Sequence, residues 1–451
     1  MTTRITEEVA HSMRPISRRT FLAGVATTAG LAACAPAAPL AGKSSGPTVV
    51  SQPGSTVNIT YWGSFSGNLG KAEQALVDRF NSSQKDVHVD YQFQGSYEDT
   101  AQKLTAALQA KTGPDVTLLS DVWWFKFYLN KILLPLDDLM KEAKVDPSDY
   151  VGVLLKEGVR KDRTYWLPFA RSTPIFYYNK DAWAKAGLPD RGPKNWDEFT
   201  KDWAPKLKGQ SKSIFAHPNA ASYVAWLFQG VIWQWGGEYS NADFKIEIDS
   251  PQGVAAGNFY ASSIKDGWAV ATNDIDAAFR TGEALAILGS TAGLAGHEAA
   301  AKFKVGAAFL PEGPAGFGCC TGGAGMAILA STPKERQLAA MKWIDFATGA
   351  GTVEWSQNTG YMPVRTSAIK GSAMADWYTK HPNFKTVVDQ LPKTRPQDAA
   401  RVYIPNGDQI IGKGLERITV AGEPASTVWK EVAATLTREA EPVLRAIKQL
   451  G

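Results

Sequence analysis

The feature that most limits the fold of this chain is an alternation of strand and helix patterns early in the sequence. Every second residue is apolar over residues 57–61 and 87–93, as in half-buried strands. Apolar residues recur at helical spacing over residues 72–80 and 101–108, and residues 116–119 resemble a short buried strand. The order strand–helix–strand–helix–strand predicts an α/β fold that contains a parallel sheet.

Glycine- and proline-containing breaks interrupt the later sequence near residues 170, 320 and 362. A single linker between two consecutive domains would need only one such break, and 451 residues are enough for two domains. We therefore predict a chain that passes back and forth between two lobes, with hinge segments and an interlobe ligand cleft. The predicted bounds are as follows: lobe I, residues 54–169 plus 323–361; lobe II, residues 170–322 plus 362–451.

The N-terminal segment has the pattern of an export signal. Residues 17–22 read Ser-Arg-Arg-Thr-Phe-Leu, a twin-arginine pattern that opens an apolar run ending at Leu31. The run is shorter than the about 20 apolar residues that a membrane-spanning helix needs, which is typical of a signal peptide. Residues 31–34, Leu-Ala-Ala-Cys, are typical of a lipoprotein cleavage site. We predict export by the twin-arginine route, removal of residues 1–33 and a lipid on Cys34.

The segment that follows the predicted cleavage site is rich in Ala, Pro, Gly and Ser and shows no periodicity. Such a composition cannot bury enough apolar surface to fold, so residues 34–53 are predicted to be a flexible stalk. The stalk would tether the folded body to the extracytoplasmic face of the cell membrane.

Three classes of function lack support in the sequence. The net charge is +4, and residues 1–33 hold four Arg and two Glu, which leaves about +2 for the rest and gives no argument for nucleic acid. Residues 407–414 approach a phosphate-binding loop, but Gly414 stands where that loop needs Ser or Thr. Cys319 and Cys320 are adjacent, which does not suit a zinc site, and buried thiols are favoured over a strained vicinal disulfide. We predict no metal and no cofactor.

Six segments of the chain carry recognisable motifs: residues 115–125, 168–180, 226–230, 321–325, 359–365 and 401–403. Together they resemble the extracellular solute-binding proteins of ABC importers, in the group that includes maltose-type binding proteins. Within that group they are most similar to the proteins that bind glycerol 3-phosphate and glycerophosphodiesters such as glycerophosphocholine. The resemblance covers nearly all of the sequence after Val57. It implies a two-lobe fold, no catalytic activity, a monomer, and the membrane permease subunits of an importer as partners.

The resemblance also implies a ligand pocket, which falls on Tyr97, Asp121, Ser172, Tyr223, Trp226, Ser290, Gly323, Tyr361 and Arg401. An Arg can bind phosphate through its planar fork of N–H groups, and hydroxyl groups can donate to phosphate oxygens. Asp121 suits the hydroxyl groups of glycerol. The aromatic residues would enclose the organic part of the ligand, where a choline cation gains about 0.5–2 kcal/mol on an aromatic face.

One pocket position departs from the most similar proteins. The actinobacterial members of the group have a small aliphatic residue where this chain has Tyr223, whereas the enterobacterial members have a large aromatic residue. The sequence therefore leaves open whether the ligand is the free monoester or a diester that bears a headgroup.

Two alternatives to this function remain. An oligosaccharide-binding lipoprotein of a sugar importer would have the same fold. A secreted carbohydrate-active enzyme is the alternative from another class, because the chain has 15 Trp and indole rings stack on sugars. No pair of carboxylates stands out in the sequence as acid and nucleophile, which argues against the enzyme.

Overall fold

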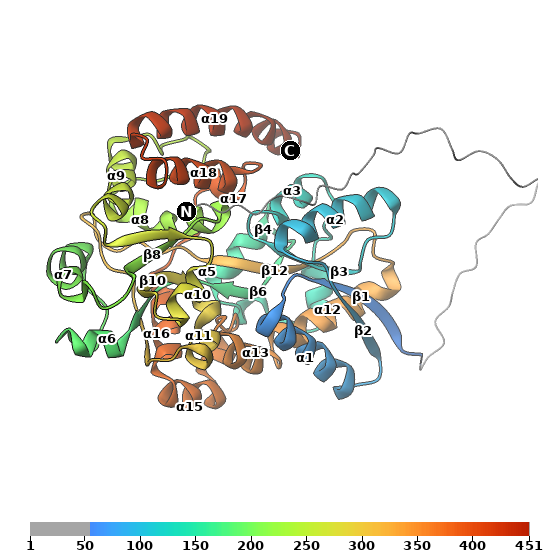
Figure 1. The fold of residues 1–451 in the computed structure, drawn as a ribbon. Helices are drawn as coiled ribbons and strands as arrows, with labels where there is room; N and C mark the ends of the chain where they lie inside the picture. Colours follow the sequence, from blue (N-terminus) through green and yellow to red (C-terminus); the bar gives the residue numbers. More distant parts are fainter. Residues whose placement is uncertain (1–54, 451) are drawn as a thin grey trace, which may run out of the picture. The chain divides into compact units, whose positions relative to one another are not determined.

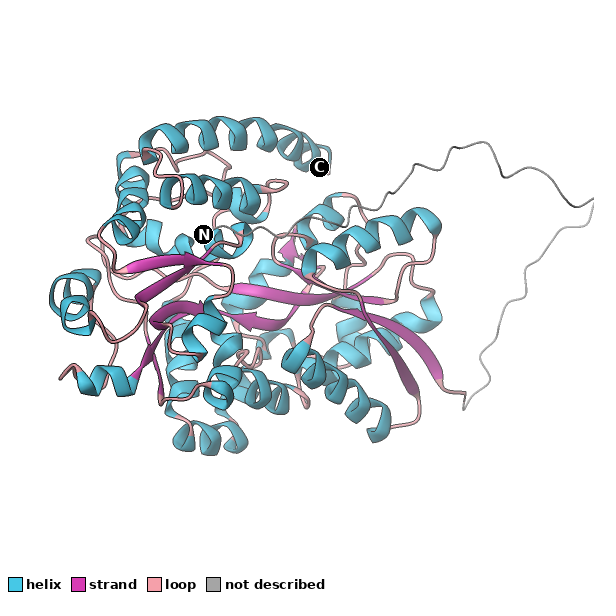
Figure 2. Cartoon of the chain, in the orientation of Figure 1, coloured by secondary structure: helices cyan, strands magenta, loops and turns pink. Residues whose placement is uncertain are grey.

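The computed structural model describes residues 55–450, which belong to one compact unit, Gly54–Gly451. The predicted signal peptide, Cys34 and the predicted stalk lie outside the described residues. Two five-stranded sheets organise this unit, and helices cover them (Figures 1 and 2). No helix within the described residues is both long and apolar enough to cross a membrane.

The first sheet contains the strands predicted near the start of the sequence. Its strands, in spatial order, are β2 (Val87–Phe93), β1 (Val57–Gly63), β3 (Val116–Ser120), β12 (Gly322–Ile328) and β6 (Leu167–Ser172). β1 pairs in parallel with both β2 and β3, which confirms the predicted parallel arrangement. β12 comes from far along the chain and pairs antiparallel with β3 and β6. The alternation in β1 buries Ile59 and Tyr61 against the core.

The second sheet is built from the middle of the chain. Its strands, in spatial order, are β11 (Val305–Ala308), β7 (Pro174–Asn179), β10 (Ala284–Ser290), β8 (Ser213–Pro218) and β9 (Ala269–Thr272). β8 pairs in parallel with β9 and β10, whereas β7 pairs antiparallel with β10 and β11. β7, β8 and most of β10 are buried, which explains why β7 and β10 read as largely apolar runs.

Helices pack around both sheets. Those beside the first sheet include α1 (Gly67–Ser83), α2 (Tyr97–Ala110), α3 (Trp124–Leu129), α4 (Asp137–Glu142), α12 (Lys334–Thr348) and α13 (Thr352–Thr359). Those on the side of the second sheet include α6 (Lys180–Lys185), α8 (Ala221–Gln234), α9 (Pro251–Lys265), α10 (Ile275–Arg280), α11 (Leu294–Ala300), α15 (Ser372–Lys380), α16 (Pro382–Gln390), α17 (Ala399–Val402), α18 (Gly407–Thr419) and α19 (Ala425–Gln449).

Within residues 55–450 the chain crosses between the two sheets three times. β6 ends at Ser172 in the first sheet and β7 begins at Pro174 in the second, so Thr173 makes the first crossing. The second crossing leads from β11 to β12, and the third leaves α13, which packs on α1, and reaches α16, which packs on β11. The crossings lie near the predicted breaks, while the predicted bounds of the two lobes stay a prediction.

A buried group of side chains joins these crossings. The Arg171 Nη2 atom lies 2.6 Å from Glu157 Oε2, and Thr321 Oγ1 donates to Glu157 Oε1 at 2.7 Å. On the third crossing, the Met362 backbone N–H donates to the Arg171 carbonyl oxygen at 2.9 Å. The strand that leads into the first crossing and residues of the other two crossings thus meet at one buried junction.

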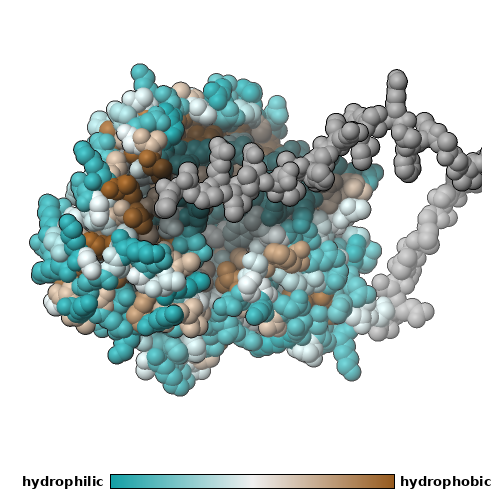
Figure 3. Space-filling model, in the orientation of Figure 1, coloured by the Kyte–Doolittle hydropathy of each residue, from teal (hydrophilic) through white to brown (hydrophobic). Residues whose placement is uncertain are grey.

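Most of the tryptophans serve the core. Trp124, Trp166, Trp183, Trp343, Trp355 and Trp429 are among the largest fully buried side chains. The face drawn in Figure 3 is mainly hydrophilic with scattered apolar residues. The high Trp content therefore gives no independent support to a sugar-degrading enzyme.

Two local predictions differ from the structure. The sequence of residues 196–207 predicts one α-helix, but a π-helix, Glu198–Trp203, precedes α7 (Ala204–Leu207). The apolar residues of 277–287 alternate irregularly and predict an extended segment that ends in an apolar strand; β10 confirms that strand, but α10 occupies the first part of the segment. The loop-like sequence 407–414 lies inside α18, where a Cβ on Gly412 would meet Ala221 O at 2.0 Å, so its glycines serve helix packing.

Candidate functional site

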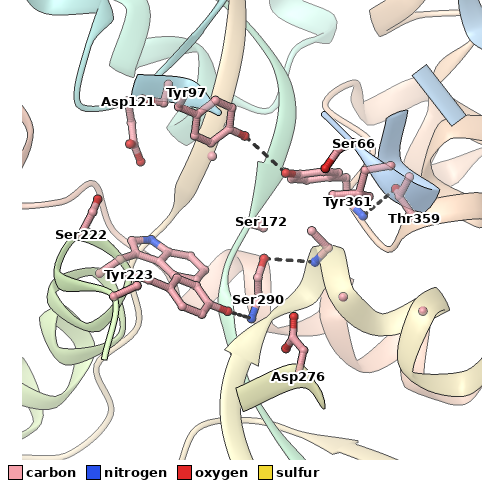
Figure 4. Close-up of a pocket in the computed structure, with 18 of the residues that line it drawn as sticks. Ser66, Tyr97, Asp121, Ser172, Ser222, Tyr223, Asp276, Ser290, Thr359 and Tyr361 are labelled. Atoms are coloured by element: carbon pink, nitrogen blue, oxygen red, sulfur yellow. Dashed lines mark hydrogen bonds between the residues drawn. The ribbon is translucent and has the colours of Figure 1, made fainter. Parts of the chain in front are cut away.

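A cleft of about 540 Å³ opens between elements of the first and the second sheet (Figure 4). The structure places all nine residues of the predicted pocket along it: Tyr97, Asp121, Ser172, Tyr223, Trp226, Ser290, Gly323, Tyr361 and Arg401. That these residues bind a ligand stays a prediction, but their meeting in one cavity is a property of the fold.

The ends of strands and helices bring these residues to the cleft from the first sheet. Asp121 directly follows β3, and Ser172 ends β6. Tyr97 is the first residue of α2, which Ser96 and Asp99 begin with a reciprocal capping box. Gly323 lies in β12 with φ of +106°, and a Cβ there would meet Ala170 O at 2.1 Å, so only glycine fits this approach of two strands.

The second group of pocket residues comes from the second sheet and the C-terminal part of the chain. Tyr223 and Trp226 lie in α8, and Ser290 ends β10. Arg401 lies in the short helix α17. Because the first group reaches the cleft from the other sheet, a ligand that touches both groups would link the two sheets.

Arg401 and Asp121 line one end of the cleft, and Gln397 forms hydrogen bonds with both. We call these three residues the Arg401 end. The Arg401 Nη1 atom donates to Gln397 Oε1, and Nη2 donates to the Ser222 carbonyl oxygen at 3.1 Å. Gln397 Nε2 in turn donates to Asp121 Oδ2 at 2.5 Å. Arg401 Nη1 lies 3.9 Å from Asp121 Oδ1, and only 5% of the Arg401 side chain is exposed. Its Nε atom is buried without a hydrogen-bond partner among the described residues.

Aromatic rings enclose the cleft on both sides. The Tyr97 and Tyr361 hydroxyl oxygens lie 3.4 Å apart on the side of the first sheet. On the opposite side, the Tyr223 and Trp226 rings stack with centroids 5.7 Å apart, and Tyr223 Oη accepts from the Ser290 N–H at 2.8 Å. Burial raises the pKa of Tyr97, Tyr223 and Tyr361, so all three phenols keep their protons and can donate to a ligand.

A charged pair at the other end of the cleft is absent from the set of residues predicted from the sequence. Asp276 and Arg280 lie on α10 and line the cavity, and His297 on α11 lies behind them. We call these three residues the Arg280 end. A carboxylate and a guanidinium four residues apart on a helix are a recognisable pair, but residues 277–287 were expected to be extended, so the spacing went unused.

Cys319 and Cys320 lie on the second crossing and are both buried and unpaired, as the sequence favoured. Burial raises the pKa of both thiols, so they stay protonated. Among residues 55–450, no group of three or more His, Cys, Asp and Glu side chains is arranged to hold a metal ion.

Comparison with known proteins extends these observations. The sequence matches the bacterial extracellular solute-binding protein family over residues 75–386. The sn-glycerol-3-phosphate-binding periplasmic protein UgpB of Escherichia coli (strain K12) is 28% identical over 361 residues, which are 75% of this chain and 81% of that protein.

Solved structures give the same result. The crystal structure of UgpB from Mycobacterium tuberculosis in complex with glycerophosphocholine has a TM-score of 0.82 and 42% identity, covering 86% of this chain and 100% of that one. The GacH receptor of Streptomyces glaucescens, solved unliganded and with acarbose, shares the fold with a TM-score of 0.75 at 20% identity, over 85% of this chain and 98% of that one. This chain, with its two-lobe α/β fold, belongs to the bacterial extracellular solute-binding proteins.

Proposed function

We propose that this chain is the solute-binding subunit of an ABC importer and captures glycerophosphodiesters, such as glycerophosphocholine, or glycerol 3-phosphate. Membership of the family supports the general role, which is solute binding outside the cytoplasm. The ligand class is supported by the two UgpB proteins, which are named for glycerol 3-phosphate or solved with glycerophosphocholine. The bound ligand would then be delivered to the permease subunits in the membrane.

The burial of Arg401 is the observation that carries this proposal. A guanidinium that is 5% exposed has lost most of its hydration, and one of its N–H groups has no partner among the described residues. A buried and incompletely paired cation is costly unless a ligand completes its hydrogen bonds. A phosphate oxygen is the natural acceptor, because Arg binds phosphate through charge-assisted hydrogen bonds.

The remaining residues of the cleft suit the rest of such a ligand. Asp121 keeps one carboxylate oxygen, Oδ1, that accepts no hydrogen bond from Gln397 and can accept from a glycerol hydroxyl. The stacked rings of Tyr223 and Trp226 offer a face for an organic headgroup.

Binding without turnover is part of the proposal. The family and the fold are those of substrate-binding proteins. We infer that the ligand is released from the protein without chemical change. Phosphorus NMR of glycerophosphocholine after prolonged incubation with the protein tests this inference, because turnover would produce new phosphate resonances.

We further propose that the ligand closes the cleft by hinge motion at the three crossings, in a monomer whose lobes have the bounds predicted above. The support is that pocket residues come from elements of both sheets. Small-angle scattering with and without saturating ligand tests this step, because closure lowers the radius of gyration and an unchanged profile argues against it.

The export route and the lipid anchor are also proposals, supported by the twin-arginine pattern at residues 17–22 and by Cys34. Mass spectrometry of the protein from membranes should find a diacylglycerol-modified Cys34 at the N-terminus. Cys34→Ala should release the protein from the membrane fraction, and retention of this variant would argue against the anchor.

Calorimetric titration of the protein with glycerophosphocholine, glycerol 3-phosphate and maltotriose tests the ligand class. Binding of a phosphate ligand that is lost in Arg401→Ala supports the proposal. Binding of maltotriose alone would keep the solute-binding role but assign it to an oligosaccharide.

A further inference from the structure

The cleft has a second charged end that none of the nine predicted residues explains. Figure 4 shows Asp121 and Asp276 toward opposite ends of the drawn residues, with Tyr223 between them and its hydroxyl directed at Ser290. Asp276 and Arg280 both line the cavity. Each end of the cleft therefore combines one carboxylate with one guanidinium.

At the Arg280 end, Asp276 and Arg280 both contact the side chain of His297. Arg280 Nη2 lies 3.9 Å from Asp276 Oδ2, and Arg280 Nε donates to His297 Nδ1 at 3.3 Å. Because an Arg N–H can only donate, His297 Nδ1 is the acceptor and the ring proton is on Nε2, which lies 3.4 Å from Asp276 Oδ1. His297 is fully buried, and its ring packs on Tyr177 with centroids 4.6 Å apart. This buried imidazole accepts a hydrogen bond from Arg280 and contacts Asp276, so it lies directly behind both charged groups.

Two glycines of the neighbouring helix region make room for the pair. Gly293 and Gly296 line the cleft, and a Cβ on Gly293 would lie 3.0 Å from His297 Nε2. A Cβ on Gly296 would lie 3.3 Å from Arg280 Nη2. At these two positions the wall beside the pair carries no side chain, and both charged groups line the cavity.

The charges decide which ligand chemistry fits this end. About a third of each side chain is exposed, 37% for Asp276 and 33% for Arg280. Burial acts to raise the pKa of Asp276, but the contact with His297 and the charge of Arg280 lower it overall, so the carboxylate stays ionised. A quaternary ammonium group would meet the guanidinium as a like charge. Neighbouring hydroxyl groups can instead donate to Asp276 and accept from Arg280 at the same time.

We propose that Asp276 and Arg280 form a second polar subsite for the headgroup of a glycerophosphodiester, so that this protein binds diesters with hydroxylated headgroups, such as glycerol or inositol, more tightly than glycerophosphocholine. This inference rests on the proposed function, in which the Arg401 end takes the phosphate. It adds the class of headgroup that the cleft selects.

The test is a calorimetric titration of the full chain with glycerophosphoglycerol, glycerophosphocholine and glycerol 3-phosphate. The wild-type protein should bind glycerophosphoglycerol about tenfold more tightly than glycerophosphocholine, the effect of one charge-assisted hydrogen bond. Arg280→Gln and Asp276→Asn should each lower this ratio of affinities about tenfold. Both variants should bind glycerol 3-phosphate with an affinity within about twofold of that of the wild type. Arg438→Gln, at an Arg that is 67% exposed on α19, is the matched control and should change nothing.

Gly296→Ala provides a second variant that keeps every charged group. Its new methyl group presses on Arg280, and the preference for the hydroxylated headgroup should fall several-fold while the melting temperature stays near that of the wild type. If the wild-type protein bound glycerophosphocholine as tightly as glycerophosphoglycerol, the inference would be overturned. An unchanged preference in Arg280→Gln and Asp276→Asn would overturn it too. Both results would leave the proposed function intact. A protein that bound none of the three phosphate ligands would overturn both.

Discussion

The two arginines of the cleft have opposite surroundings. Arg401 is 5% exposed, donates to two protein acceptors and keeps one N–H without a partner among the described residues, whereas 33% of Arg280 is exposed and its charge is paired with Asp276. A desolvated cation interacts strongly with a ligand charge, while a half-exposed ion pair is screened by water and salt. Under the proposals above, the Arg401 end would therefore supply affinity and the Arg280 end selectivity.

The largest expected effect comes from removing the buried cation. Arg401→Ala should weaken binding of both glycerol 3-phosphate and the diesters about a hundredfold or more, because truncating a buried charged partner costs about 2–5 kcal/mol. Calorimetry measures the effect. A loss of less than about threefold for every phosphate ligand would contradict the assignment of affinity to the Arg401 end.

A pH-dependent effect on stability should come from Asp398, which follows Gln397 of the Arg401 end in the sequence. Burial raises the pKa of Asp398, which precedes α17 and accepts from the Tyr239 N–H at 2.7 Å, to about 6. The folded protein therefore binds this proton more tightly than the unfolded chain does, and the free energy of unfolding should fall as pH rises from about 4 to about 6. Asp398→Asn should remove about 2 kcal/mol of this decline in denaturant titrations, because each unit of pKa is worth about 1.4 kcal/mol.

Asp376→Asn, at an exposed position on α15, is the control for this measurement and should keep the slope of the wild type. An Asp398→Asn variant with the full wild-type slope would show that other carboxyl groups cause it. The Arg280 end should contribute nothing in this range, because the pKa of Asp276 is lowered rather than raised.

The next largest effect on ligand affinity should come from Tyr223, whose ring lies between the two ends of the cleft. Tyr223→Leu removes the phenol that reaches from α8 to Ser290, so a headgroup at the Arg280 end should have more room to align with Asp276 and Arg280. We expect the affinity for glycerophosphoglycerol relative to glycerol 3-phosphate to rise further, by about tenfold, as for one additional hydrogen bond to a charged group. Tyr223→Phe keeps the ring and should leave this ratio nearly unchanged. An equal change in both variants would assign the effect to the lost hydrogen bond.

Ionic strength should have the smallest effect on ligand affinity, and its effect should differ between the Arg401 end and the Arg280 end. Raising ionic strength from about 0.05 to about 0.5 M should weaken glycerol 3-phosphate binding only a few-fold, because Arg401 is buried and poorly screened. The preference for a hydroxylated headgroup should shrink about twofold, since Arg280 is more exposed. A steep and equal loss for all ligands would instead show binding by exposed charges.

Much of the fold could be predicted from local patterns. The alternation in residues 57–61 and 87–93 and the apolar run at 116–119 identified β1, β2 and β3, because a half-buried or fully buried strand leaves a periodic trace in the sequence. The helix α10 was missed because its six residues are too few for the helical period to stand out. Its omission also hid Asp276 and Arg280 from the predicted site.

What the sequence by itself determined about this protein is the α/β class, the three breaks and, through resemblance, the nine residues that line the cleft. Only the tertiary structure decided that Arg401 is buried with an incomplete set of partners and that Asp276 and Arg280 face the same cavity. The physical reason is that burial and charge pairing depend on distances between segments far apart in the chain. Packing of the two sheets and the three crossings sets those distances, and no local pattern of residues records them.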